Sequence, residues 1–154
     1  MKSESETCTI ICKSIPNCYK IPDPSSDFTQ TISRPFDCFG SFRGKPLYIE
    51  VKHKKGLLSL NLQDIQDHQI ENLMQLKTDM PYAECWIIWG VTTGKHGDNR
   101  FYVFTDIHEI NRRRNAKENI KKKELETLPY LKLFKGVVDF SSLAESPNTN
   151  IPAS

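Results

Sequence analysis

The segment PFDCFGSFRGKPLYIEVKHKKG, residues 35–56, decides the fold because it predicts a β-hairpin. Residues 36–42 form the first expected strand, and residues 47–53 form the second. The intervening residues 43–46, Arg-Gly-Lys-Pro, contain the glycine and proline that are typical of a turn. Antiparallel pairing across this turn is expected to place Asp37 beside the end of the second strand.

The second strand of this hairpin alternates between apolar and polar residues, as a strand with one buried face does. The apolar positions are Leu47, Ile49 and Val51, and the polar positions are Tyr48, Glu50 and Lys52. Successive side chains of a strand point to opposite faces of the sheet. The polar face is therefore expected to carry a carboxylate and an amine two residues apart.

A helix is expected after the hairpin. Asn61 is a suitable N-cap, and Asp64 three residues later completes a pattern similar to a capping box. Residues then recur at spacings of three and four, at Leu62, Ile65, Gln69, Leu73 and Leu76. Pro81 closes the segment. Gln69 is the polar member of this stripe, so its amide is expected to face the sheet.

The remaining pattern predicts further strands and short helices. Residues 85–91 contain two tryptophans and predict a central strand, 100–105 a returning strand and 131–134 a last short strand. A second capping box at 106–109 begins a short helix, and 138–144 is expected to dock as another. The order of elements predicts an α/β or α+β sheet with helices packed on it.

The length of 154 residues suits one domain with one core. Residues 1–18 are interpreted as a variable N-terminal segment, with an unstructured start over 1–7 and a short strand or edge element over 9–15. Residues 19–145 are the expected domain, and 146–154 read as a disordered tail.

The composition leaves the type of ligand open. The net charge of +2 does not by itself identify a nucleic-acid-binding protein. Basic residues cluster at 52–55, 112–114 and 121–123, and each run either neutralises phosphates or forms a solvated surface. No apolar stretch approaches membrane-spanning length, and residues 1–7 lack the apolar core of a signal peptide. A cytoplasmic protein without a membrane partner is expected.

The five cysteines do not form a recognisable motif. They lie at positions 8, 12, 18, 38 and 85, and no C-x-x-C occurs. Reduced thiols are the favoured interpretation. Cys8, Cys12 and Cys18 together with His53 offer a metal-binding set, but their irregular spacing disfavours it.

The residues that carry chemistry are Asp37, Glu50 and Lys52. Hydrolysis of a phosphodiester needs charge compensation at the phosphate and an activated water, and a divalent metal held by carboxylates provides both. Mg²⁺ prefers a few oxygen ligands, for which the Val51 backbone carbonyl is a third candidate. A lysine beside the metal can orient or deprotonate the attacking water. Gln69 is expected to support the site through a hydrogen bond.

These residues lie in a segment that resembles a known family. PFDCFGSFRGKPLYIEVKHKKG, followed by LNLQDIQDHQIENL at 60–73, is similar to the RecU family of Holliday junction resolvases within the PD-(D/E)xK nucleases. The matching motifs are the aspartate at 37, the Glu-x-Lys at 50–52 and the glutamine at 69. The resemblance runs from about Tyr19 to Glu145, and its specific part covers residues 35–72.

The resemblance implies a restriction-endonuclease-like mixed central sheet flanked by helices. It also implies that Asp37 and Glu50 bind Mg²⁺ (with Mn²⁺ as a substitute), that Lys52 assists the water, and that a homodimer cuts branched DNA. Phosphate contacts are expected from Arg43, Lys54 and Lys55, which are near the motif in sequence.

The sequence departs from the family in two places. The family begins with a helix that contributes to the active site, and no such pattern is recognised before Tyr19. Its basic stalk is replaced by a short interval between Tyr19 and Asp37. Two alternatives therefore stay open: a restriction- or repair-type nuclease of the same superfamily, and a DNA-binding module without catalysis.

Overall fold

The computed structural model describes residues 1, 3–22, 34–94 and 98–143. Its elements, in chain order, are α1 (Glu4–Ser14), β1 (Tyr19–Lys20), β2 (Cys38–Phe42), β3 (Lys45–Lys55), η1 (Leu62–Asp64), α2 (Asp67–Asp79), β4 (Glu84–Thr92), β5 (Asn99–Phe104), α3 (Ile107–Asn115), α4 (Lys122–Leu125), β6 (Leu131–Phe134), β7 (Val137–Val138) and η2 (Phe140–Ser142). The predicted tail at 146–154 lies outside the described residues.

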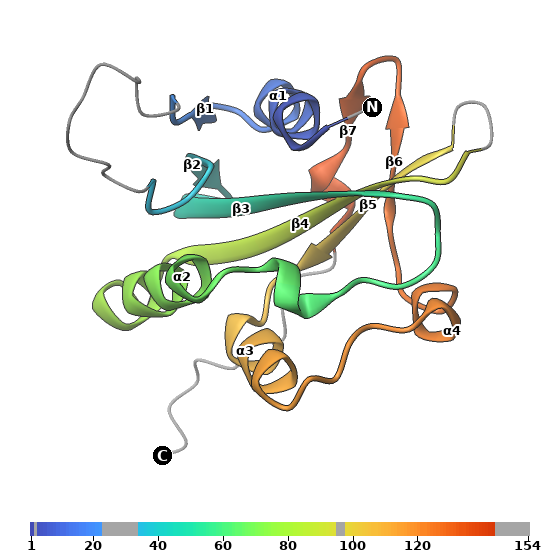
Figure 1. Cartoon of the computed structure of the whole chain (residues 1–154). Coiled ribbons are helices and arrows are strands. Elements are labelled where there is room, and N and C mark those ends of the chain that lie inside the picture. The colour runs from blue at the N-terminus through green and yellow to red at the C-terminus, as the bar shows by residue number, and fades with distance from the viewer. Residues whose placement is uncertain (2, 23–33, 95–97, 144–154) are drawn as a thin grey trace, which may run out of the picture.

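The strands form one seven-stranded sheet in the order in which they occur in the chain (Figure 1). The β3–β4 pair is parallel, and the other neighbouring pairs are antiparallel. A parallel pair needs a crossover connection, and α2 provides it between β3 and β4. The predicted α/β class, with a mixed central sheet flanked by helices, is confirmed.

Helices cover both faces of the sheet. Figure 1 shows α1 on one face and α2 and α3 on the other. Two apolar clusters fill these layers. The cluster under α1 contains Ile11, Ile49, Trp86, Phe101 and Phe140, and the opposite cluster contains Leu62, Leu73, Trp89, Tyr102 and Ile110. The predicted alternation of β3 is confirmed, because Leu47, Ile49 and Val51 belong to the first cluster and Tyr48 packs against the second.

The N-terminal prediction was wrong, because residues 4–14 form α1. Ser3 caps this helix by accepting a hydrogen bond from the Glu6 amide at 3.1 Å. Cys8, Ile11 and Ile15 recur at helical spacing and are all buried. The β-branched residues at 9–11 favoured a strand, but burial of this apolar stripe against the sheet outweighs their weak preference.

The start of the predicted second helix was also wrong. Asn61 caps the short 3₁₀ turn η1 through a hydrogen bond from the Gln63 amide. The Leu62 amide donates to the Asn119 side chain, and Leu60 forms a bridge with Ile120. These bonds to a distant segment hold residues 60–62 outside a continuous helix, so α2 begins only at Asp67.

Most of the elements predicted after residue 84 are present in the structure. The expected strands at 85–91, 100–105 and 131–134 correspond to β4, β5 and β6, and Asp106 caps α3 as predicted. The short helix expected at 138–144 is replaced by β7 and the 3₁₀ turn η2. None of the helices in the described ranges is long and apolar enough to cross a membrane.

The seating of α1 on the sheet depends on a glycine in β4. A Cβ added at Gly90 would lie 2.6 Å from Cγ2 of the buried Thr7. Gly90→Ala should therefore lower the free energy of unfolding by about 1–3 kcal/mol, measured by urea denaturation. Adding Thr7→Ser, which removes Cγ2 but keeps the hydroxyl that donates to the Ser3 carbonyl, should restore part of the loss. A Gly90→Ala variant as stable as wild type would contradict this packing.

Candidate functional site

The candidate site lies where β2 stops short of β3. β2 pairs with residues 45–49, whereas β3 continues to Lys55. Within the described ranges, no strand flanks residues 50–55 of β3 on that side. The next backbone amide, that of Val51, donates instead to the Asp37 carboxylate with an N–Oδ2 distance of 2.8 Å. A side chain thus takes the position of the missing strand.

The same arrangement determines where the Val51 carbonyl points. In an antiparallel ladder the N–H and C=O of one residue point to the same side, because a hydrogen-bonded pair exchanges both bonds. Since the Val51 amide faces Asp37, its carbonyl faces the same open edge. The structure therefore brings together the Asp37 carboxylate and the carbonyl oxygen named from the sequence.

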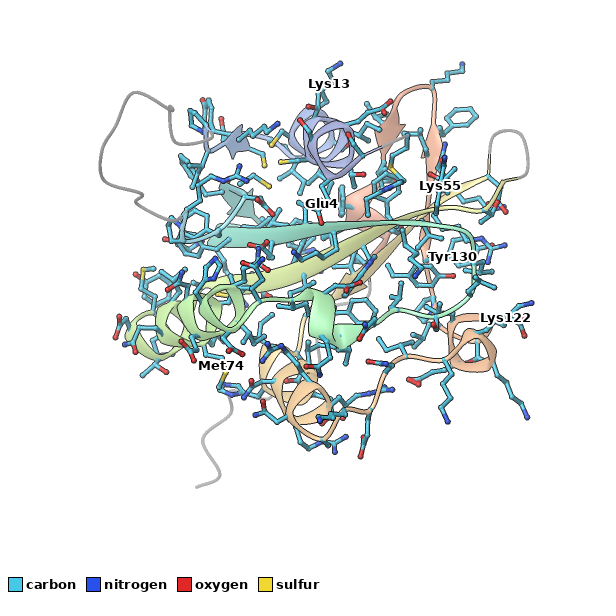
Figure 2. All side chains as sticks on the ribbon, viewed as in Figure 1. Glu4, Lys13, Lys55, Met74, Lys122 and Tyr130 are labelled. Carbon is cyan, nitrogen blue, oxygen red and sulfur yellow. The ribbon has the colours of Figure 1, made fainter. Side chains whose placement is uncertain are left out.

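Glu50 and Lys52 are both buried, with exposed fractions of 2% and 7%. Lys52 Nζ lies 3.8 Å from Glu50 Oε1 and 3.8 Å from Glu4 Oε1. Glu4 belongs to the first turn of α1, and Figure 2 shows it between α1 and β3. One ammonium group therefore joins carboxylates from two elements that are far apart in the sequence.

Burial makes the charged forms of the carboxylates in this cluster less favourable. The pKa of Glu50 is raised to about 9, mainly because burial disfavours the charged form, and further because Asp37 is close; Lys52 opposes the shift. The pKa of Glu4 is also raised by burial, again opposed by Lys52. One lysine thus does not compensate the carboxylates around it.

The donor set fits a hard divalent cation such as Mg²⁺. Glu4, Asp37 and Glu50 offer carboxylate oxygens, and Val51 offers a carbonyl oxygen, which are the ligand types that Mg²⁺ prefers. A cation would also favour the ionised form of Glu50, whose pKa is raised by burial beside Asp37. The chemistry of the residues is therefore suited to such an ion.

Glu4 was missed from the sequence. The expectation that no first helix contributes to the site was wrong, because α1 delivers Glu4 to Lys52. The signal was present in Ser3 followed by Glu6, a capping pattern, and in the spacing of Cys8, Ile11 and Ile15. What no local pattern reveals is that the helix lies over β3.

Gln69 has a different position from the one expected. It is the third residue of α2, and its Oε1 accepts a hydrogen bond from the Gln66 amide at 2.9 Å. The amide oxygen therefore caps the helix N-terminus. Because α2 begins only at Asp67, the earlier members of the expected apolar stripe lie outside this helix. The residues that α2 buries are Ile70 and Leu73.

The three predicted phosphate-binding residues lie in different places. Lys54 shares the face of Glu50 and Lys52 because strand side chains alternate, whereas Lys55 points to the other face and is exposed. Arg43 lies in the β2–β3 turn, at the opposite end of the hairpin from Asp37. Its guanidinium donates to the carbonyls of Ser141 and Leu143, so it fastens the C-terminal segment to the turn.

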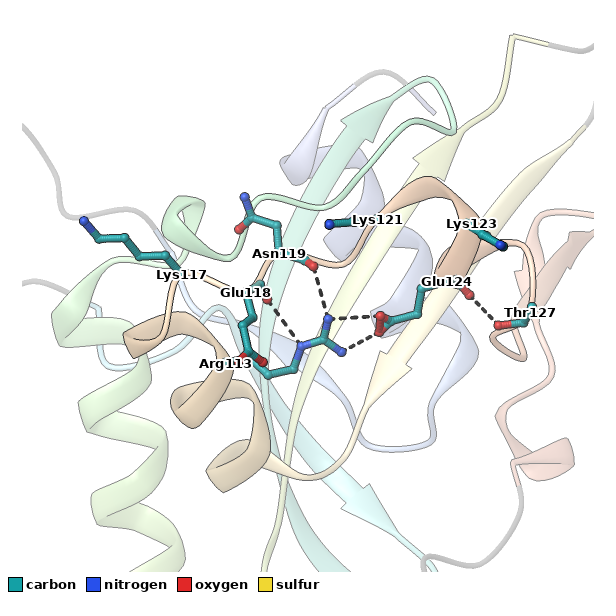
Figure 3. A pocket seen from close by; sticks show the side chains of 8 residues that line it. All are labelled: Arg113, Lys117, Glu118, Asn119, Lys121, Lys123, Glu124 and Thr127. Atoms are coloured by element: carbon teal, nitrogen blue, oxygen red, sulfur yellow. Dashed lines mark hydrogen bonds and ion pairs between the residues drawn. The ribbon is translucent and has the colours of Figure 1, made fainter.

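The arginine run at 112–114 is largely paired within the protein. Arg112 pairs with Glu109 and Glu118, and Arg114 pairs with Asp67. Figure 3 shows Arg113 bound to Glu124 and to backbone carbonyls, beside a pocket. The lysines that line this pocket are Lys117, Lys121 and Lys123. The arginines therefore stabilise the α3–α4 region, which accounts for them without a phosphate.

Comparison with known proteins gives little further information. No protein-family model matches the sequence, and no curated protein sequence matches it significantly. Among solved structures, the chain is similar to Archaeoglobus fulgidus Hjc, a Holliday junction resolvase from an archaeal hyperthermophile. The match has 14% identity and a TM-score of 0.36, and covers 70% of this chain and 84% of that chain. Similarity at this level assigns neither a family nor an activity.

The raised pKa of Glu50 predicts how stability depends on pH without divalent ions. Folding favours the protonated carboxyl, and the unfolded chain releases this proton above its ordinary pKa of 4.5. The contribution of Glu50 to stability is therefore present below that value and is lost as pH rises toward about 9. Glu50→Gln should be more stable than wild type by about 1–3 kcal/mol at alkaline pH.

This is measured by urea unfolding at about pH 5 and about pH 9. Glu71→Gln, at an exposed position of α2, is the matched control and should follow wild type at both values. If the difference between Glu50→Gln and wild type does not grow with pH, Glu50 is not the strained carboxyl that its burial indicates.

Proposed function

We propose that this protein is a Mg²⁺-dependent DNA endonuclease whose active site comprises Glu4, Asp37, Glu50 and Lys52. The observation that carries the proposal is a group of three carboxylates at the open edge of β3: Lys52 pairs with Glu4 and Glu50, and Asp37, bound to the Val51 amide, lies close to Glu50. Two of the carboxylates come from the hairpin and the third comes from α1, so the cluster is not a by-product of neighbouring positions in the sequence.

Each residue has a role that follows from its position. Asp37, Glu50 and the Val51 carbonyl would hold the ion, with Glu4 beside them. Bound Mg²⁺ supplies positive charge at a phosphodiester and makes water easier to deprotonate. The Lys52 ammonium, fixed between Glu4 and Glu50, would orient the attacking water and offset the negative charge that develops on the phosphate.

The surroundings of Asp37 and Glu50 affect how each would bind the ion. The Val51 amide holds one Asp37 oxygen, Oδ2, in a fixed orientation. Burial of Glu50 means that a cation must replace a proton there, so ion affinity should increase with pH. Lys54, on the face of Glu50 and Lys52, would contact the phosphates of a nucleic acid close to the cluster, and Lys55 would add positive charge from the other face.

Branched DNA is the proposed substrate, and a homodimer is the proposed assembly. Both rest on the resemblance of residues 35–72 to RecU resolvases. A two-fold-symmetric pair of active sites suits a four-way junction. A nuclease acting on linear duplexes is the second candidate. It is favoured by the short interval between Tyr19 and Asp37, which leaves no room for a long basic insertion.

Cleavage of a labelled four-way junction and of a matched linear duplex tests the proposal. With Mg²⁺, wild type should cut the junction in preference to the duplex, and omission of Mg²⁺ should abolish cutting. Asp37→Asn, Lys52→Ala and Glu4→Gln should each lower the rate by at least about 100-fold, because each removes a group that helps to hold the ion or orients the attacking water. Glu71→Gln should retain the wild-type rate.

The other outcomes separate the alternatives. Equal cutting of both substrates indicates a general nuclease. Tight junction binding without cutting, by a correctly folded wild type, indicates a binding module and overturns the catalytic proposal. Full activity of Glu4→Gln would remove α1 from the site while leaving the roles of Asp37 and Lys52 intact.

Ion binding can be measured without DNA. An ion that binds only the folded state stabilises it by about 2.7 kcal/mol at a concentration 100 times its dissociation constant. Millimolar Mg²⁺ or Mn²⁺ should raise the melting temperature of wild type by several degrees at alkaline pH, and less at acidic pH, where Glu50 is protonated. Asp37→Asn should lose this rise, and Glu71→Gln should keep it.

A further inference from the structure

Four of the five cysteines gather at one place between α1 and β2. The Sγ atoms of Cys8, Cys12 and Cys38 all lie within 4.8 Å of one another. Cys18 joins them, with its Sγ 3.4 Å from that of Cys12. These four residues are called the cysteine cluster below. It is separate from the carboxylate site and has no part in the proposed hydrolysis.

Three segments deliver the cluster. Cys8 and Cys12 are four residues apart on α1 and therefore share one face of the helix. Cys38 is the first residue of β2 and is fully buried in the sheet. Cys18 lies in the connection after α1, which brings it against β2.

The position of Cys18 is built into the backbone. Asn17 has a positive φ of 57°, which turns the chain directly before Cys18. A Cβ added at Gly40 would lie 3.0 Å from Cys18 Cα and 3.1 Å from Cys18 Cβ. The absence of a side chain at Gly40 thus lets Cys18 approach β2 closely enough to reach the other thiols.

We propose that Cys8, Cys12, Cys18 and Cys38 bind one Zn²⁺ ion as a tetrahedral, four-thiolate structural site. Zinc–sulfur bonds of about 2.3 Å in a tetrahedron place the sulfur atoms about 3.8 Å apart. The Cys12 and Cys18 sulfurs, 3.4 Å apart, are close to this value, and the sulfurs of Cys8, Cys12 and Cys38 lie within 4.8 Å of one another. Four cysteine ligands leave no open coordination position, which is typical of structural rather than catalytic zinc.

Other uses of four thiols fit less well. An iron–sulfur cluster places an inorganic core between its thiolates and needs them farther apart than a single ion does. A disulfide would use one pair, such as Cys12 and Cys18, and would leave the buried Cys8 and Cys38 without a role. A single zinc ion uses all four.

The surroundings suit such a complex. Cys8 and Cys38 are buried, whereas Cys12 and Cys18 are partly exposed, so an ion could enter from the surface. Four thiolates and one Zn²⁺ carry a net charge of −2, and Lys20 is close enough to act electrostatically on Cys8. The Lys20 side chain is held over α1 by a hydrogen bond to Ser5.

The proposed zinc would connect the two elements that bear site residues. Glu4 lies one helical turn before Cys8, and Asp37 directly precedes Cys38. An ion joining α1 to β2 therefore fixes the distance between these carboxylates. The zinc site does not depend on the proposed nuclease activity, because its ligands and its readout are different.

Metal analysis of the purified protein tests the proposal. Wild type, isolated with reductant from zinc-supplemented cultures, should contain one zinc per chain by plasma mass spectrometry. Exchange with Co²⁺ should give thiolate-to-cobalt charge-transfer bands and the visible bands of tetrahedral coordination. Cys12→Ser and Cys18→Ser should each lose most of the bound metal. Cys85→Ala is the matched control, because Cys85 is buried in β4 on the opposite side of the sheet, and it should retain the metal.

Several results would overturn the proposal. One is a reduced, folded wild type that takes up neither zinc nor cobalt in stoichiometric amounts. Another is a natively purified chain with a Cys12–Cys18 disulfide, or one that holds iron with sulfide. Because the cobalt spectrum is recorded on wild type, the test stands even if a serine variant does not fold. If wild type holds zinc but does not cleave DNA, the nuclease proposal fails and the zinc proposal stands.

Discussion

The hydrogen bond from the Val51 amide to the Asp37 carboxylate is the interaction on which the candidate site depends. It ends the β2–β3 ladder by giving a side-chain acceptor to an amide that would otherwise pair with another strand. Because the ladder ends there, the edge of β3 beyond Ile49 is left open in the described part of the molecule. Glu50, Lys52 and the Val51 carbonyl become accessible to a third element at this edge, and that element is α1.

Bringing these carboxylates together is electrostatically unfavourable, and other interactions in the fold must offset this. Carboxylates of like charge repel one another, and burial of Glu50 raises the free energy of its ionised form. Lys52 compensates only part of this, since it is shared between Glu4 and Glu50. The apolar clusters, which include Ile49 and Val51 on either side of Glu50, supply the burial that offsets this cost.

The hairpin and its Glu-x-Lys motif could be predicted because their signals are local. Strand alternation assigns Glu50 and Lys52 to one face within a few residues, and the turn at 43–44, inside the predicted turn at 43–46, sets the pairing that brings Asp37 to Val51. The elements that were misassigned depend on distant contacts. The start of α2 is displaced by the bonds of residues 60–62 to Asn119 and Ile120, which no window around Asn61 contains.

Glu4 was missed, and Cys38 was not grouped with Cys8, Cys12 and Cys18, for a related reason. Cys8, Cys12, Cys18 and Cys38 have no regular spacing, and only the packing of α1 on the sheet brings them together. In the same way, Glu4 becomes part of the site only because the helix lies over β3. Topology converts irregular intervals in the chain into short distances in space, so composition and periodicity could not reveal either group.

α1 keeps its position although its first turn carries negative charge toward other carboxylates. Glu4 and Glu6 in its first turn are favoured by the helix dipole, but Glu4 is also directed toward the carboxylates of the hairpin. A helix held only by its N-terminal contacts would relieve this repulsion by moving away. Instead, Ile11 and Ile15 are buried in the core, Thr7 packs on Gly90, and the cysteine cluster lies one turn beyond Glu4. These anchors all follow Glu4 along the helix, so the apolar core and the thiols hold α1 while its first turn carries the charge.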